Sequence, residues 1–134
     1  MRKLLLVFTL LLLVSGQKVL VSYSEELEDK ILQYYFAGME DSFYVDIGGF
    51  HPISLSNTLR LYSQGWRGIN VEPDPTRFKT FLELRPGQLN LNIAMGNKDS
   101  FETFYEMSDP IISTMDEKVK DKSKRQFSKE ILVP

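Results

Sequence analysis

The chain has 134 residues, of which 43% are hydrophobic and 25% charged, a composition ordinary for one globular domain. Its formal net charge is -2, so it carries no basic field that would recruit nucleic acid. Cysteine is absent, which excludes disulfides, thiolate metal ligands and a cysteine nucleophile. The single histidine, His51, cannot build a histidine-rich metal site by itself, and the sequence predicts no metal site.

Residues 1–17 resemble a leader. Two basic residues precede an apolar run at positions 4–14, and the small residues Ser15 and Gly16 follow it. A positive start, a short apolar stretch and small residues are the layout of a secretory signal peptide, with cleavage expected next to Gly16. Because the run is about half the length that crosses a bilayer, it also fits a short helix that associates with a membrane or is simply buried.

A helix is predicted over residues 22–36. Ser24 is its expected N-cap, and acidic residues follow in the first turns. Leu27, Ile31 and Tyr35 recur at helical spacing and are expected to form the buried face. A buried strand follows over residues 42–47, where aromatic and β-branched residues surround one interior acid.

The next predicted pair is a helix over residues 54–65 and a strand over residues 66–72. Leu55, Leu59 and Tyr62 fall at helical spacing and are expected to face the core. The strand ends on an acid, which places a carboxylate at its carboxyl end.

A third helix, over residues 73–87, has the clearest local signals. Asp74 can cap it, and a proline suits its first position. Phe78, Phe81 and Leu82 are its expected buried stripe, and a Pro-Gly pair ends it.

The remaining segments predict two strands and a charged tail. Residues 88–95 read as a third strand and residues 101–107 as a fourth, at an edge of the sheet. The segment 115–130 carries charges of both signs and predicts a solvated loop or a mobile helix. The apolar residues 131–134 look like the start of another strand.

Strands and helices that alternate predict an α/β fold with parallel pairing and right-handed crossovers. We expect about three parallel strands plus an edge strand, with flanking helices. A doubly wound sheet usually has about five or six strands, so the predicted sheet is incomplete.

Ligands of such sheets bind at the carboxyl ends of the strands. The first end holds Asp46, Gly48 and Gly49, the second ends at Glu72, and the third is the turn at residues 92–95. Glycines let the backbone approach a ligand closely, and Glu72 follows them near the spacing of an acid that binds ribose hydroxyls. The alternative is that the glycines only form a tight turn and that Glu72 is a solvated acid.

The type of cofactor is indicated by what the glycine turn lacks. A dinucleotide site needs a third glycine, so that a helix N-terminus can meet the pyrophosphate. Here Gly49 is followed by Phe-His-Pro, which disfavours a nicotinamide oxidoreductase. Asp46, inside the strand, suits a cationic ligand, and S-adenosylmethionine carries both a sulfonium and an ammonium group.

With these residues the sequence resembles the N-terminal half of the FkbM family of S-adenosylmethionine-dependent methyltransferases. The resemblance spans about residues 21–116 and rests on V-D-I-G, H-P, S-N-T, G-W-R-G-I-N-V-E-P and L-N-x-A in this order. It implies a Rossmann-like methyltransferase fold that usually acts on oxygen atoms of saccharides or other small metabolites. The chain then divides into the leader, a methyltransferase half over residues 18–116, and a charged loop with the start of the next strand over residues 117–134.

The resemblance also assigns binding positions. Glu72 matches the ribose-binding acid, the turn from Asn92 matches the adenine side, and Ser24, Glu28 and Asp29 match an upstream segment that closes over the cofactor. His51 is the only residue with an unperturbed pKa suited to a general base, but its place in the turn suits shaping the pocket, so no catalytic residue is assigned. The expected cofactor-binding residues are Asp46, Gly48, Gly49, His51, Glu72, Asn92, Ala94 and Met95.

The family's second half, which binds the methyl acceptor, has no counterpart in the sequence. The expectation is therefore a methyltransferase chain that is truncated and weakly active or inactive, whose acceptor would be a saccharide or another small molecule. The alternative is a non-catalytic half-domain that binds a nucleotide or a partner. The leader favours a membrane-associated or exported protein, whereas a cofactor made in the cytosol favours the cytoplasm.

Overall fold

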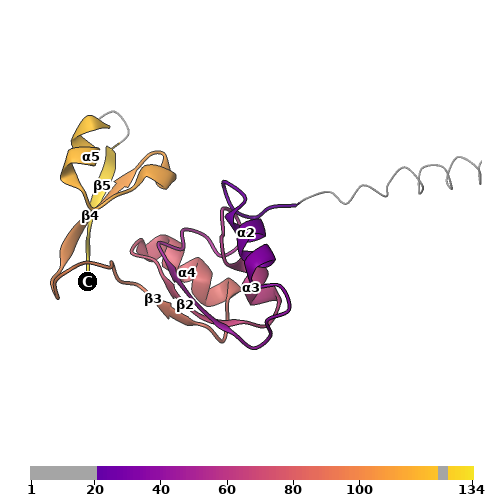
Figure 1. Ribbon diagram of the computed structural model, residues 1–134. Helices are drawn as coiled ribbons and strands as arrows, with labels where there is room; N and C mark the ends of the chain where they lie inside the picture. Colours follow the sequence, from indigo (N-terminus) through magenta and orange to yellow (C-terminus); the bar gives the residue numbers. More distant parts are fainter. Residues whose placement is uncertain (1–20, 124–126) are drawn as a thin grey trace, which may run out of the picture.

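The computed structural model describes residues 21–123 and 127–134 (Figure 1). The predicted leader and the apolar run at residues 4–14 lie outside the described residues. The described chain is a small α/β protein with a three-stranded parallel sheet and a separate antiparallel pair of strands. Its elements are α2 (Glu28–Tyr35), β1 (Phe43–Ile47), α3 (Leu59–Ser63), β2 (Arg67–Val71), α4 (Pro75–Leu84), β3 (Leu89–Leu91), β4 (Glu102–Met107), η1 (Pro110–Ile112), α5 (Glu117–Lys122) and β5 (Phe127–Val133).

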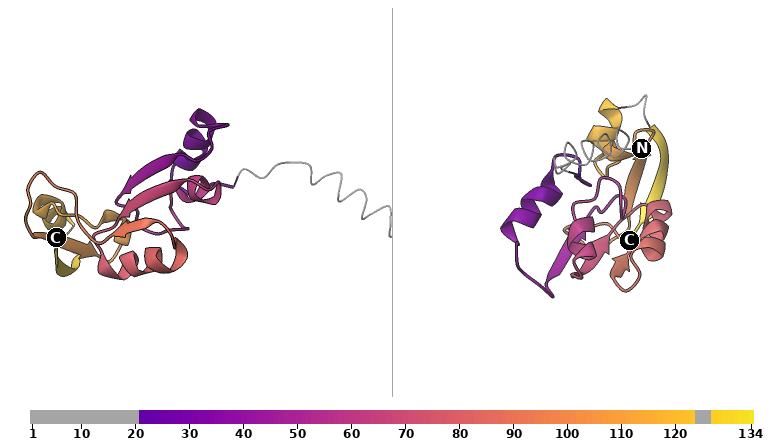
Figure 2. Two further views of the ribbon diagram at one scale, coloured as in Figure 1. Left: turned by 90° about the horizontal axis from the view of Figure 1, so that it is seen from below. Right: turned by 90° about the vertical axis from the view of Figure 1, so that its right-hand side faces the viewer.

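The parallel sheet has the strand order β1-β2-β3, so each strand pairs with its successor in the chain. Val45 is in register with Ile69, and Ile69 with Leu89. Because the order never reverses and crossovers are right-handed, α3 and α4 lie on the same face of the sheet. Figure 2 shows α4 running along this face. The parallel pairing expected from alternating strands and helices is therefore confirmed.

The covered face of the sheet packs around a small aromatic cluster. Tyr44 of β1, Leu61 of α3 and Trp66 are buried together, and Leu32 of α2 packs against them. Next to this cluster the side chain of Arg85, just after α4, is fully buried. A charged side chain can be buried in this way only when its donors are satisfied, and Arg85 is held by several acceptors.

Helix α4 begins and ends as its local signals predict. Asp74 is the N-cap, and its carboxylate accepts hydrogen bonds from the backbone N–H groups of Thr76 and Arg77, with Pro75 in the first turn. Phe81 is buried, as expected, but Leu82 is 51% exposed. The stripe is therefore narrower than the periodicity indicated.

Helix α2 departs from its prediction in start and in orientation. It begins at Glu28 rather than near Ser24, after Leu27 in a left-handed conformation. Leu27, Ile31 and Tyr35, the expected buried face, are 47%, 53% and 74% exposed. The prediction was wrong because periodicity identifies an apolar stripe but not whether another element covers it.

Helix α3 and strand β3 are shorter than predicted. Residues 54–58 form turns rather than helix, and Leu55 has a positive φ of 56° that no regular helix contains. Leu61 is the buried residue of α3, and Tyr62 packs partly buried against the aromatic cluster as expected. Strand β3 ends at Leu91, before the predicted turn at residues 92–95.

The last elements form an antiparallel unit instead of joining the first sheet. Strand β4 was expected at an edge of that sheet, but it pairs antiparallel with β5 in a two-stranded sheet. Residues 131–134 do not begin a further parallel strand, since Ile131 pairs with Phe104. Part of the charged segment is the helix α5, which lies against this unit (Figure 1).

Candidate functional site

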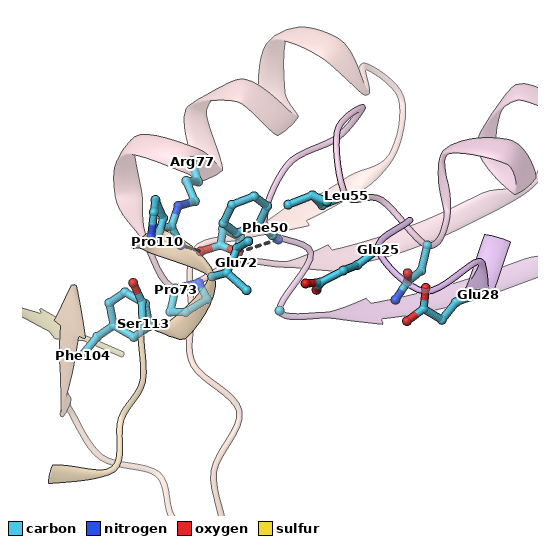
Figure 3. A pocket seen from close by; sticks show the side chains of 13 residues that line it. Glu25, Glu28, Phe50, Leu55, Glu72, Pro73, Arg77, Phe104, Pro110 and Ser113 are labelled. Carbon is cyan, nitrogen blue, oxygen red and sulfur yellow. Dashed lines mark hydrogen bonds and ion pairs between the residues drawn. The ribbon is translucent and has the colours of Figure 1, made fainter. Parts of the chain in front are cut away.

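A cavity of about 260 Å³ lies at the carboxyl ends of β1 and β2, where the antiparallel unit meets the parallel sheet (Figure 3). This volume is just below the roughly 300–1,000 Å³ range of ligand pockets. Its position is where open α/β sheets bind ligands. The lining residues are Glu25, Glu28, Gly48, Phe50, Leu55, Asn57, Glu72, Pro73, Arg77, Phe104, Pro110, Ile111 and Ser113.

Glu72, directly after β2, is the most constrained residue of this cavity. It is 2% exposed, and its two carboxylate oxygens accept backbone N–H groups from Asp74 at 2.9 Å and Phe50 at 2.8 Å. Burial raises the pKa of the Glu72 carboxyl above its ordinary value, while these two N–H groups and the Arg77 guanidinium act in the opposite direction. A carboxylate oxygen can accept two hydrogen bonds, and each oxygen of Glu72 has one backbone donor here.

The glycine turn after β1 lies against the end of β2. The N–H groups of Gly48 and Gly49 both donate to the carbonyl oxygen of Val71, at 2.9 and 3.1 Å. Gly48 has φ 73° and lines the cavity, whereas a Cβ on Gly49 would lie 2.7 Å from the ring of Phe81. A left-handed conformation and a close ring explain why both positions are glycine.

Asp46 does not line the cavity. Its side chain turns to the covered face, where it accepts a hydrogen bond of 2.5 Å from the hydroxyl of Thr58. Thr58 in turn accepts from the buried guanidinium of Arg85 at 2.9 Å. Alternation along β1 causes this placement, because neighbouring side chains of a strand point to opposite faces.

His51 has a local structural role in the turn. Its Nδ1 atom accepts the backbone N–H groups of Ile53 and Ser54, at 3.1 and 3.0 Å. It is not among the residues that line the cavity. These bonds shape the loop between β1 and α3, whereas the sequence suggested that His51 shapes the pocket itself.

The residues of the turn after β3 contact two different parts of the structure. The amide of Asn92 donates to the carbonyl oxygens of Glu72 and Pro73, at 2.8 and 2.9 Å, and so fixes the loop that carries the carboxylate. Ala94 and Met95 line another cavity, of about 440 Å³, beside Pro134. Of the eight expected binding residues, only Gly48 and Glu72 therefore line the cavity at the carboxyl ends of β1 and β2.

The upstream segment was expected to close over the cofactor through Ser24, Glu28 and Asp29. It contributes one of these three residues to the cavity. Glu28 lines the cavity, while Asp29 is buried and accepts hydrogen bonds from Ser22, Ser24 and the backbone of Tyr23. These bonds anchor the start of α2 next to the turns of the sheet. The Glu28 carboxylate itself accepts the backbone N–H of Glu26 at 2.8 Å.

Sequence reasoning did not identify Phe50, Arg77 and Phe104 as lining residues. The Arg77 guanidinium lies 4.8 Å from the centre of the Phe50 ring and 3.9 Å from the Glu72 carboxylate. The position of Arg77 in the first turn after Glu72 could have indicated it. Phe104 gives no such signal, because the antiparallel unit brings it there from a distant part of the chain.

Carboxylates outnumber cations around the cavity. Glu25, Glu28 and Glu72 line it, with Arg77 as the basic residue of the lining. This excess of negative charge fits a ligand with a cationic group, and the carboxylate of Glu72 fits hydroxyl donors. Among the described residues, no group of three His, Asp or Glu side chains could hold a metal ion.

Comparisons with protein-family models, curated proteins and solved structures find no match to this chain. Within the part of the chain that the structure describes, no helix has the length and apolar character needed to cross a membrane.

Proposed function

We propose that the chain binds S-adenosylmethionine in the cavity at the carboxyl ends of β1 and β2. The observation that carries the proposal is the buried carboxylate of Glu72, which faces the cavity beside the Gly48 turn and keeps free acceptor positions for a ribose diol. The other carboxylates of the lining suit the sulfonium and ammonium groups. The Phe50 ring, with Arg77 above it, offers an apolar wall.

The activity we propose is methyl transfer of the FkbM type, to an oxygen atom of a saccharide or another small metabolite. Three parallel strands with their helices on one face and a glycine turn after the first strand support a Rossmann-like methyltransferase sheet. The sulfonium activates the methyl carbon for in-line displacement, so the protein needs mainly to align the two substrates.

The second candidate is a non-catalytic half-domain that binds a nucleotide or a partner. One observation favours it. The described residues that line the cavity include no histidine, the residue type whose ordinary pKa suits a general base. A binding function needs no general base.

Titration calorimetry of the full chain with S-adenosylmethionine and with NAD⁺ tests the binding proposal. We expect heat with S-adenosylmethionine only, and an affinity at least about tenfold weaker in Glu72→Gln. Glu83→Gln, on the exposed side of α4, is the matched control and should bind like the wild type. Urea unfolding of all three proteins separates lost binding from lost folding.

Two outcomes count against the proposal. Equal binding by a folded Glu72→Gln variant contradicts the ribose assignment, and binding of NAD⁺ alone contradicts the cofactor. Binding without methyl transfer to any of a panel of saccharides supports the non-catalytic candidate instead.

A further inference from the structure

The outer edge of β1 carries unpaired backbone groups. The N–H of Arg67 donates to Ser42, and the N–H of Gly48 donates to Val71. In a parallel ladder alternate residues of a strand bond to the same neighbour, so the even-numbered residues of β1 face β2. The N–H and C=O groups of Phe43, Val45 and Ile47 therefore point away from the sheet, and no described strand pairs with them.

The same residues expose apolar side chains. Phe43, Val45 and Ile47 are 59%, 54% and 59% exposed on the face opposite α3 and α4. An exposed apolar edge strand is a template for another strand, and natural proteins usually protect such edges with lysine, proline, a bulge or shortness. Strand β1 has no lysine, proline or bulge, and its one inward-pointing charge, Asp46, already accepts the Thr58 hydroxyl. It is five residues long, whereas the opposite edge strand β3 has three.

We propose that β1 pairs antiparallel with β1 of a second copy of this chain, so that the two sheets join into one. A two-fold axis at Val45 places Val45 opposite Val45 of the second copy, and Phe43 opposite Ile47 of the second copy. In this register each pair exchanges both hydrogen bonds, and all outward N–H and C=O groups of the strand are satisfied.

Charge is compatible with this register. The single charged residue of β1, Asp46, lies opposite Tyr44 of the second copy rather than opposite a second Asp46, so no like charges meet across the strands. Asp46 also already accepts the Thr58 hydroxyl. The edge is accessible, because a hollow of about 490 Å³ opens beside it, lined in part by Phe36, Met39 and Trp66.

Val45→Lys, with Leu89→Lys as the matched control, tests the proposal by sedimentation equilibrium of the full chain. Both side chains are 54% exposed on the same face and in the same cross-strand row, but they lie on opposite edges of the sheet. We expect the wild type and Leu89→Lys to dimerise, and Val45→Lys to dissociate at least about tenfold more readily. Loss of the dimer in both variants would show packing through the apolar face and overturn edge pairing.

Amide hydrogen exchange of the wild type gives a second readout that needs no variant. The amides of Val45 and Ile47 should become protected as protein concentration rises, while those of Tyr44 and Asp46 are protected at all concentrations. A chain that stays monomeric overturns the proposal. Concentration-independent protection of Val45 and Ile47 also overturns it, since another segment of the same chain would then occupy the edge.

Discussion

On the face of the sheet that α3 and α4 cover, β1 presents Tyr44 and Asp46, whereas on the uncovered face it presents Phe43, Val45 and Ile47. The covered side chains are 7% and 9% exposed, and the uncovered ones are all more than half exposed. The polar acid is thus inside and the apolar residues are outside, the reverse of an ordinary amphipathic strand. The comparison shows that, within the described residues, helices cover one face of the sheet while the other face leaves the apolar side chains of β1 exposed.

Arg85 explains how the covered face tolerates polar groups. Its guanidinium donates to the carbonyl oxygen of Pro52, the hydroxyls of Tyr44, Ser56 and Thr58, and the amide oxygen of Asn70. One side chain therefore satisfies acceptors from β1, β2 and the loop that follows the glycine turn. The polar groups of this face are buried as one hydrogen-bonded network.

Replacing Arg85 is the largest expected perturbation. Arg85→Met keeps apolar volume but leaves several buried acceptors without donors, and we expect a loss of roughly 3–5 kcal/mol in the free energy of unfolding. Arg67→Met, at an exposed position of β2, is the control. Urea denaturation measures the free energy of unfolding of both variants. Equal stability of the two would show that the Arg85 hydrogen bonds do not stabilise the covered face.

Gly68 tests how closely the covered face is packed. A Cβ at this position would collide with the buried ring of Tyr44, which cannot move away because Arg85 holds its hydroxyl. Gly68→Ala should therefore cost roughly 1–3 kcal/mol. Gly96→Ala, where a Cβ meets no atom within 4 Å, should be close to neutral in thermal unfolding; a cost as large as that of Gly68→Ala would refute the steric explanation.

Asp29 extends the polar packing to α2, and its effect should depend on pH. Burial acts to raise the pKa of the Asp29 carboxyl, but hydrogen bonds from Ser22, Tyr23, Ser24 and Arg60 outweigh it and hold the pKa below the ordinary 3.8. The ionised carboxylate thus stabilises the fold above pH 3.8, and the stabilisation is lost as pH falls through the lowered pKa. Asp29→Asn should be destabilised at neutral pH.

The measurement is the free energy of unfolding of both proteins as a function of pH. The difference between wild type and Asp29→Asn should narrow as the solution is made acidic. A difference that stays constant with pH would mean that the carboxylate charge plays no part.

Phe43 should give the smallest effect, although it is the largest apolar side chain of β1. Because it is 59% exposed, Phe43→Thr should change the stability of the protomer by less than about 0.5 kcal/mol. The neighbouring Tyr44→Phe, which removes only a hydroxyl, should cost about 1 kcal/mol through the lost Arg85 hydrogen bond. Chemical denaturation at low protein concentration measures both stability changes. A larger loss for Phe43→Thr than for Tyr44→Phe would contradict the difference between the two faces.

Local signals predicted the elements that local interactions stabilise. Helix α4 begins at its Asp74 cap, and β1 and β2 lie where aromatic and β-branched residues are concentrated. The antiparallel unit was not predicted, because the pairing of β4 with β5 depends on contacts across the intervening η1 and α5. Such pairing is a non-local event that no short window of sequence encodes.

The candidate site was predicted in part for the same reason. Gly48 and Glu72 follow strand ends, and parallel strands bring their ends to one edge, so both line the cavity. Asp46 was predicted on the correct strand, but its side chain points to the face that α3 and α4 cover and not into the cavity. Phe104 was missed because it reaches the cavity from the antiparallel unit.

By itself the sequence determined the order of strands and helices from α2 to β4, the glycine turn and the acid at the end of β2, since caps, turns and periodicity act over a few residues. Only the tertiary structure decided which apolar stripes are covered. Ile31 is exposed on α2 and Val45 on β1, although both lie in apolar patterns that predict burial. The physical reason is that burial requires a second surface, and the position of that surface depends on how all elements pack together.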